Sequence, residues 1–140
     1  MPASNSLGTI EGLTSIRSSF DPKATIDRVE AEIRARGLNV FARIDHAAGA
    51  AEVGLPLAPT ELIIFGNARG GTPLMQSAQT VGIDLPLKIL VWQDTANDTW
   101  LSYNEPRWIA RRHNVANAEP VVSKMTTMLS AIVKKAATPQ

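Results

Sequence analysis

Residues 38–45 alternate between apolar and other side chains, and this period of two constrains the fold more than any other feature of the chain. The side chains at every second position of an extended segment point to the same face of a sheet. A strand with one apolar face is typical of an antiparallel sheet that is covered on one side only. The face predicted to be buried consists of Leu38, Val40, Ala42 and Ile44.

Helix and strand signals alternate along the rest of the chain. Asp21 and Pro22 form a helix start, because Asp caps a helix well and Pro suits its first position, and Gly37 is a good stop. Further strands are predicted over residues 13–20, 61–65, 87–93 and 99–103, and further helices over 46–53, 72–79, 104–113 and 117–135. Asn104 is the expected cap of the third of these helices. The turn-rich residues 94–98 make the last two strands a hairpin.

These elements predict an α+β fold, with a single-layer antiparallel or mixed sheet and helices packed mainly on one face. A mixed doubly wound sheet is the alternative. We expect residues 1–12 to be a flexible lead-in and residues 13–140 to form a single domain. The helix over 117–135 carries an apolar stripe, which packs either on its own core or on another subunit. The stripe consists of Val121, Val122, Met125, Met128, Leu129, Ile132 and Val133.

A glycine-rich segment follows the apolar run that ends at Phe65, and a Thr72-Pro73 helix start comes after it. This order predicts a strand, a tight loop and a helix. Backbone N–H groups at such a helix start can hold an anion, with Arg69 as counter-charge. The alternative is a simple connector, in which the glycines supply positive φ angles and Thr72 caps the helix.

Several short motifs in this order resemble the domain of unknown function 302 family. The motifs are Ile44-Asp45-His46-Ala47-Ala48, Phe65-Gly66-Asn67, Gly71-Thr72-Pro73-Leu74-Met75 and Asp84-Leu85-Pro86-Leu87-Lys88, extended by Trp92-Gln93-Asp94 and Arg112-His113. The sequence departs from the family at Ala68, where proline is usual, and at Gln93, where an acid is usual. The resemblance covers residues 17–115 and leaves the C-terminal helix outside. It implies a small α/β domain with an antiparallel sheet, often a homodimer, and no established activity.

Composition excludes several classes of protein. The chain has no cysteine, so disulfides, thiolate nucleophiles and cysteine-bound metals are ruled out, and a cytoplasmic location is expected. A net charge of +1 with scattered basic residues argues against binding nucleic acid. No apolar run approaches the ~20 residues that span a bilayer, so we expect a soluble protein with no membrane partner.

Only two histidines are present, His46 and His113, with no closely spaced pair, so no metal site is predicted. The cofactor is left unassigned, with His46 the best haem candidate. His113 is interpreted as a helix stop. Asp84 is expected to cap a turn or to pair with Arg43 or Arg69. The residues predicted to bind a ligand are Asp45, His46, Asn67, Arg69, Gly70, Gly71, Thr72 and Asp84.

Three functional hypotheses follow from these residues. The preferred one is a dimeric domain that binds a small polar or anionic ligand, in a cleft between the Asp45-His46 turn and the loop 67–72. The second is an enzyme at the same cleft, with His46 as acid–base group and loop amides stabilising an oxyanion. The third is an oligomeric interaction module without a small-molecule site, which would use the apolar stripe or the hairpin with Trp92 and Trp100.

Overall fold

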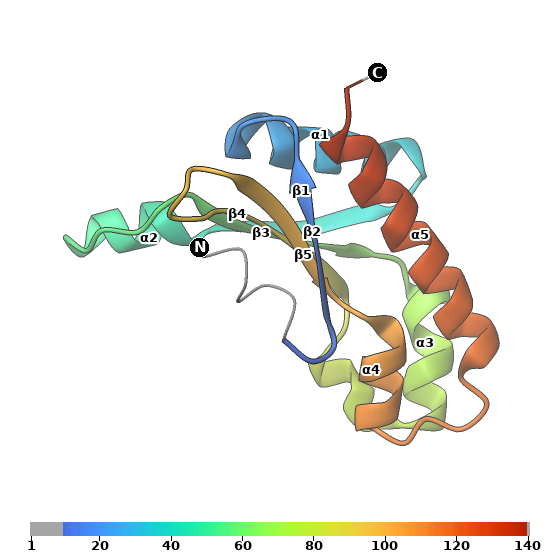
Figure 1. Ribbon diagram of the computed structural model, residues 1–140. Coiled ribbons are helices and arrows are strands. Elements are labelled where there is room, and N and C mark those ends of the chain that lie inside the picture. The colour runs from blue at the N-terminus through green and yellow to red at the C-terminus, as the bar shows by residue number, and fades with distance from the viewer. Residues whose placement is uncertain (1–9, 140) are drawn as a thin grey trace.

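A five-stranded sheet forms the centre of the protein in the computed structural model, which describes residues 10–139 (Figure 1). The strands are β1 (Leu13–Ser18), β2 (Asn39–Asp45), β3 (Thr60–Gly66), β4 (Leu87–Gln93) and β5 (Thr99–Asn104). Their order across the sheet is β1-β5-β4-β3-β2, and every neighbouring pair is antiparallel. The predicted α+β class is therefore confirmed in its antiparallel form, and the predicted hairpin is β4 and β5. The expected lead-in over residues 1–12 lies largely outside the described residues.

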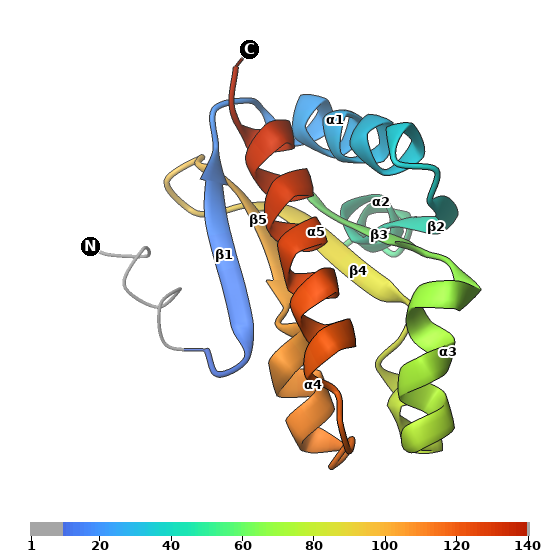
Figure 2. The same cartoon turned by 90° about the vertical axis from the view of Figure 1, so that its right-hand side faces the viewer.

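Two long helices cover one face of the sheet. Helix α1 (Pro22–Ala35) and helix α5 (Glu119–Ala137) lie side by side on this face, as Figures 1 and 2 both show. Helices α3 (Ala68–Ser77) and α4 (Pro106–Arg112) lie below the sheet and contact the first half of α5. A 3₁₀ turn, η2 (Gln79–Ile83), follows α3, and α2 (His46–Glu52) extends from the opposite end of the sheet.

The core lies between the sheet and these two helices. Ile26, Val29 and Ile33 of α1 are fully buried, because they recur on one face of the helix. From α5, the buried stripe packs on the protein's own sheet, which resolves the alternative left open by the sequence. Its buried members are Val122, Met125, Leu129, Ile132 and Val133. Burying side chains of this size contributes about 1.5–3 kcal/mol each, so α5 is an integral part of the fold.

The start of α1 forms as predicted, and a side chain of α1 also contacts the C-terminal end of α5. Asp21 accepts a hydrogen bond from the Ala24 N–H at 2.7 Å. Arg28 donates to the carbonyl groups of residues 135, 136 and 138 at the end of α5. The Arg28 guanidinium also lies 4.2 Å from the centre of the Phe20 ring. These contacts fix the C-terminal end of α5 against α1.

The strict alternation predicted for residues 38–45 is wrong in its second half. A β-bulge between Val40 and Ala42 shifts the register of β2 against β3. A bulge inserts one extra residue, so every later side chain points to the opposite face. Val40 therefore packs on the core, whereas Ile44 lies on the other face and is 40% exposed. Arg43 consequently points toward α1, where it meets carboxylates.

Two predicted helix starts are also wrong. Helix α3 begins at Ala68, four residues before Thr72, and Asn67 is its cap, accepting from the Gly70 N–H at 2.8 Å. The glycine-rich segment is thus the first turn of a helix and not a loop, because the Asn67 cap favours helix formation despite two glycines. Asn104 does not cap α4, since it is the last residue of β5 and Glu105 occupies the cap position.

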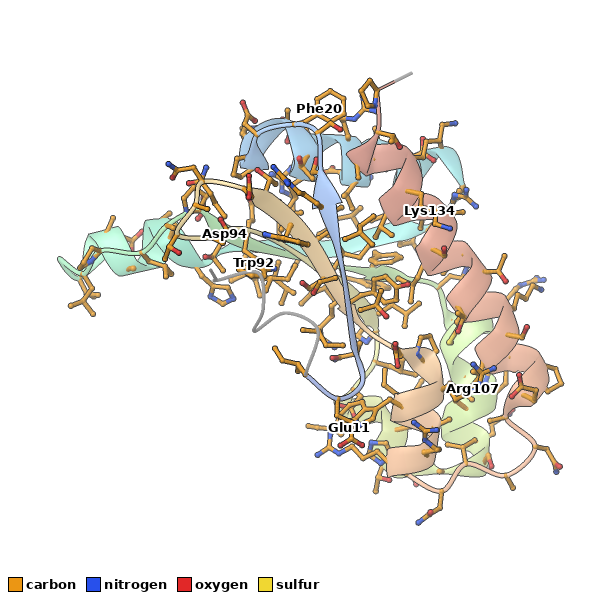
Figure 3. All side chains as sticks on the ribbon, in the orientation of Figure 1. Glu11, Phe20, Trp92, Asp94, Arg107 and Lys134 are labelled. Atoms are coloured by element: carbon orange, nitrogen blue, oxygen red, sulfur yellow. The ribbon has the colours of Figure 1, made fainter. Side chains whose placement is uncertain are left out.

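The second face of the sheet is rich in half-buried apolar side chains. Strand register places Trp92 of β4 opposite Trp100 of β5 on this face, and their rings stack with centres 6.3 Å apart. Figure 3 shows Trp92 on the side of the sheet away from Lys134 of α5. Both indole N–H groups are satisfied, by Ser102 and Asp94 respectively. Ala42, Ile44, Leu62, Ile64 and Leu90 share this face.

Candidate functional site

A pocket of about 700 Å³ opens between the start of α3, the start of β2 and the first half of α5. Its lining is mostly apolar. Phe65, Leu87 and Met125 form its buried base, and Met75 and Met128 lie along its walls. Methionine side chains are flexible, so these walls can adapt to the shape of a bound molecule. The volume lies within the range of small-molecule sites, roughly 300–1,000 Å³.

A few polar groups meet at the rim of this pocket. Asn67 and Arg69 come from the start of α3, and Lys124 comes from α5. Among residues 10–139, Arg69 and Lys124 take part in none of the ion pairs. The N-terminus of α3 adds a partial positive charge at the same place. The pocket therefore combines an apolar interior with a positively charged rim.

Only some of the backbone N–H groups at the start of α3 are free to bind an anion, fewer than the sequence predicted. The Gly70 N–H is held by the Asn67 side chain at 2.8 Å, and the Gly71 N–H points to the Asn67 carbonyl at 3.4 Å. Ala68 and Arg69 occupy the first two helical positions, whose N–H groups have no partner within a helix. A Cβ at Gly71 would lie 3.4 Å from Leu85 and 3.6 Å from Met75. The glycine thus leaves space where the helix faces the pocket.

The cleft predicted between the Asp45-His46 turn and residues 67–72 does not form. Asp45 pairs with Glu61 at one end of the β2–β3 ladder, and Asn39 pairs with Gly66 at the other. Six residue steps along β2 separate these ends by about 20 Å. Asp45 caps α2 by accepting from the Ala48 N–H at 2.9 Å, and both Asp45 and His46 are exposed.

Of the predicted ligand-binding residues, the structure brings together Asn67, Arg69, Gly70 and Gly71 along one wall of the pocket. Thr72 lies outside it, on an exposed position of α3. The contribution of α5 to the pocket, in particular that of Lys124, is not among the residues predicted from the sequence. A signal for it exists, since Val121 and Met128 lie three and four residues away and so share its side of the helix.

Asp84 is the C-cap of the 3₁₀ turn η2, which agrees with the first of its two predicted roles, whereas the predicted pairing with Arg43 or Arg69 does not form. Both of its carboxylate oxygens accept from Arg112, at 2.8 and 2.9 Å, and one also contacts His113 Nε2 at 2.6 Å. Burial raises the pKa of the Asp84 carboxyl, but the hydrogen bond from His113 and the charge of Arg112 outweigh it and lower the pKa overall. His113 ends α4, as expected, and its ring also makes this contact.

Within residues 10–139, no group of three or more histidine and carboxylate side chains is arranged to hold a metal ion. In the same part of the chain, no helix has the length and apolar character needed to cross a bilayer.

Comparison with solved structures supports the fold. The chain superposes with a TM-score of 0.81 on the crystal structure of an uncharacterized conserved protein DUF302 from Bacillus stearothermophilus. The match covers 91% of this chain and 99% of the other at 19% sequence identity, so it shows a common fold alone.

Sequence comparison finds relatives that are much longer than this chain. The protein is 46% identical over 127 residues to "Fluoride-specific ion channel FluC 1" of Brucella suis biovar 1, and equally to "Fluoride-specific ion channel FluC 2" of Brucella melitensis biotype 1. The alignment covers 90% of this chain, but the chain spans only about half the length of these relatives. The channel name therefore belongs to the longer proteins, and this chain matches only one part of them.

The family match covers most of the chain. Residues 14–132 match the family described as "Domain of unknown function DUF302". The match extends beyond the 17–115 of the sequence resemblance and takes in α5 as far as Ile132, so the C-terminal helix belongs to the family's fold and is not an addition to it. With its fold, its motifs and this match in agreement, the chain belongs to the DUF302 family.

Proposed function

We propose that the protein binds a small molecule that has an apolar body and an anionic head, such as a carboxylate, in the pocket between α3 and α5. The single observation that carries this proposal is the pocket itself, an apolar space of about 700 Å³ with Arg69 and Lys124 at its rim. This keeps the anionic-ligand hypothesis but moves it away from Asp45 and His46.

The physical argument combines burial with charge. An apolar ligand body gains about 25 cal/mol for each Å² of apolar surface that it removes from water. Arg69, Lys124 and the free end of the α3 dipole favour a negative charge at the rim. The base of the pocket consists of Phe65, Leu87 and Met125, which offer no polar partner, so a wholly polar ligand would lose its water there without compensation.

The enzyme hypothesis is less well supported than binding. His46, its acid–base group, lies five residues beyond Phe41, a residue of β2 that lines the pocket, which is about 16 Å along the strand, whereas a catalytic group must come within hydrogen-bond reach of the substrate. A role for His46 would therefore need a separate substrate site around α2.

Octanoate and 1-octanol are suitable probes, because they share an apolar chain and differ in the charge of the head. Isothermal titration calorimetry is expected to detect one octanoate per chain. Arg69→Ala and Lys124→Ala should each weaken octanoate binding about tenfold, as expected for the loss of one charge-assisted contact, and should leave 1-octanol binding unchanged. Gly71→Leu should block both probes, because its side chain would fill the space beside Leu85 and Met75.

Arg111→Ala is the matched control, since this arginine is exposed on α4 and outside the pocket. If Arg111→Ala weakens octanoate binding as much as Arg69→Ala and Lys124→Ala do, their effect comes from the net charge of the protein and not from the pocket. Failure of octanoate to bind the wild-type protein, or binding that Gly71→Leu does not alter, would reject the proposal.

The names of the Brucella relatives suggest a second candidate, a domain that works beside a fluoride channel. What supports it is the 46% identity over 127 residues to one part of those proteins. Sodium fluoride belongs in the same calorimetric titrations, with sodium chloride as its control. Heat from fluoride alone would favour this candidate, and equal traces for the two salts would argue against direct binding of fluoride by this domain.

We also propose that two copies associate through the second face of the sheet, and that the protein works in the cytoplasm as a single domain. The support for association is the band of apolar side chains across β2, β3, β4 and β5, because large apolar surfaces on a protein are typical of interaction sites. The absence of cysteine supports a reducing compartment.

A further inference from the structure

Three side chains form a continuous hydrogen-bonded chain outside the pocket. Asp84 Oδ2 lies 2.6 Å from His113 Nε2, and His113 Nδ1 lies 2.9 Å from Thr80 Oγ1. Thr80 belongs to η2, Asp84 follows it, and His113 ends α4, so two segments about 30 residues apart in sequence meet here. None of the three lines the pocket between α3 and α5.

The direction of the hydrogen bonds follows from the carboxylate. An ionised carboxylate only accepts, so His113 must donate from Nε2. In the neutral imidazole the other nitrogen then carries a lone pair, and Thr80 donates its hydroxyl proton to Nδ1. The arrangement is carboxylate, imidazole and hydroxyl in the order that makes a hydroxyl oxygen nucleophilic.

The surroundings hold this arrangement in place. The side chains of His113 and Asp84 are only 9% and 14% exposed, and Arg112 binds both oxygens of Asp84. Lys88 also lies nearby, and its Nζ donates to the carbonyl oxygens of Asp84 and Pro86. Thr80, by contrast, is exposed, so its oxygen can be reached from solvent while its base is fixed behind it.

We propose that Thr80 is a nucleophile that accepts an acyl group from an activated ester or thioester, with His113 as its general base and Asp84 as a positioning residue. In this step Thr80 Oγ1 forms a bond to the acyl carbon, and its proton passes to His113 Nδ1. The tetrahedral adduct then breaks its bond to the leaving alcohol or thiol, which takes the proton from the imidazolium. The product is an acyl ester of Thr80, which water can cleave by the same route.

The neighbouring surface indicates the class of acyl group. Ile83 lies three residues after Thr80, one turn of a 3₁₀ helix, so the two side chains share a face of η2. Ile83 is 74% exposed, and an apolar acyl chain could cover it. A short aliphatic acyl group therefore suits this surface better than a charged one.

A purely structural link between η2 and α4 would use the same hydrogen bonds, so the test must measure reactivity. The probe is p-nitrophenyl butyrate, an activated ester with a short aliphatic acyl group. We expect the wild-type protein to release p-nitrophenolate faster than buffer does, with a butyryl group on Thr80 in peptide mass spectra.

Thr80→Val and His113→Gln are expected to reduce this protein-dependent rate about 100-fold, the usual contribution of nucleophile activation by a base. Thr80→Ser keeps the hydroxyl and should retain the reaction. Thr127→Val, at an exposed threonine of α5, is the matched control and should react like the wild type. Melting curves for each variant separate lost reactivity from lost folding.

The proposal fails if Thr80→Val reacts as fast as the wild type, or if the butyryl group is found only on lysines. It also fails if Thr80→Ser, while folded, has no protein-dependent rate. Because none of these variants touches the pocket, octanoate binding is an independent measurement, and either proposal can fail without the other.

Discussion

At the scale of single residues, Arg43 forms more ion pairs than any other side chain within residues 10–139. Its guanidinium contacts Glu61 at 2.9 Å, and Asp27 and Glu30 of α1 at 3.0 Å each. The hydrogen bond to Glu61 raises the pKa of Arg43 far above its normal value, against the effect of burial. The pKa of Glu30 is lowered, chiefly by its hydrogen bond from Arg43. The pKa of Asp27 is also lowered, first by Lys23 and then by Arg43.

Arg43→Met should destabilise the protein by about 1–3 kcal/mol near pH 7, because it leaves the half-buried Glu61 without its cation and takes one of two cations from Asp27 and from Glu30. Carboxyls with a lowered folded-state pKa stabilise above their unfolded-state pKa, about 4, and lose that contribution as the pH falls through the folded-state value. The penalty of Arg43→Met should therefore shrink near pH 2. Urea unfolding of both proteins at the two pH values measures it.

Arg34→Met is the control for this measurement. Arg34 pairs with Glu30 alone and is 59% exposed, so its loss should cost less than about 0.5 kcal/mol. If the two variants are equally destabilised, or if the penalty of Arg43→Met persists near pH 2, the carboxylates do not explain the role of Arg43.

At the scale of elements, α3 is the helix that the sequence predicts least well. The sequence suggests a start at Thr72, because Pro73 is favoured at the first helical position, but the Asn67 cap starts the helix at Ala68. Pro73 therefore lies inside α3, where it has no N–H to donate to the carbonyl of Arg69. This helix forms one wall of the pocket, so an internal defect lies next to the proposed binding site.

Pro73→Ala should raise the free energy of unfolding by about 1–2 kcal/mol, since it restores a helical hydrogen bond and removes a steric clash. This net value allows for an opposing effect, because alanine gives the unfolded chain more conformational entropy than proline does. Thermal unfolding followed by circular dichroism measures the change. Pro120→Ala is the matched control, because Pro120 lies in the first turn of α5, where proline costs little. A gain at Pro120 as large as that at Pro73 would contradict this explanation.

Most elements could be predicted from local sequence because their signals are local. The Asp21-Pro22 start of α1, the hairpin of β4 and β5, and the apolar stripe of α5 all follow from spacing and caps. The bulge in β2 could not be predicted, since it depends on the partner strand β3. The distance between Asp45 and Asn67 was missed for a similar reason, because it is set by the length of the β2–β3 ladder.

At the scale of the whole molecule, the sheet has two unlike faces. Helices α1 and α5 cover one face (Figure 1), and the opposite face carries Trp92 (Figure 3). Trp100 and the apolar neighbours lie on the same face as Trp92. The sequence predicted a sheet covered mainly on one side, and the structure confirms it. The apolar character of the second face could not be predicted from the sequence, because the bulge moves Ala42 and Ile44 onto this face.

Ile44→Glu should disrupt the proposed association of two copies, because it places a charge on this face at a position that is already 40% exposed and so tolerant of substitution. Size-exclusion chromatography with light scattering should show a dimer for the wild type and a monomer for the variant. Ile83→Glu, at an exposed site outside this face, should remain dimeric. A monomeric wild type would reject the association outright.

The position of β1 also has a consequence for how the chain is made. Among residues 10–139, strand β1 pairs with β5 alone, so Ile16 has no partner in the sheet until Leu101, 85 residues later, has been synthesised. At about 5–20 residues per second, a ribosome leaves this strand without its partner for roughly 4–17 seconds. A strand that lacks its partner during synthesis is less prone to aggregate if it is polar. Strand β1 is polar, since it contains Thr14, Ser15, Arg17 and Ser18. Its composition suits the long delay in translation as well as its final place at the edge of the sheet.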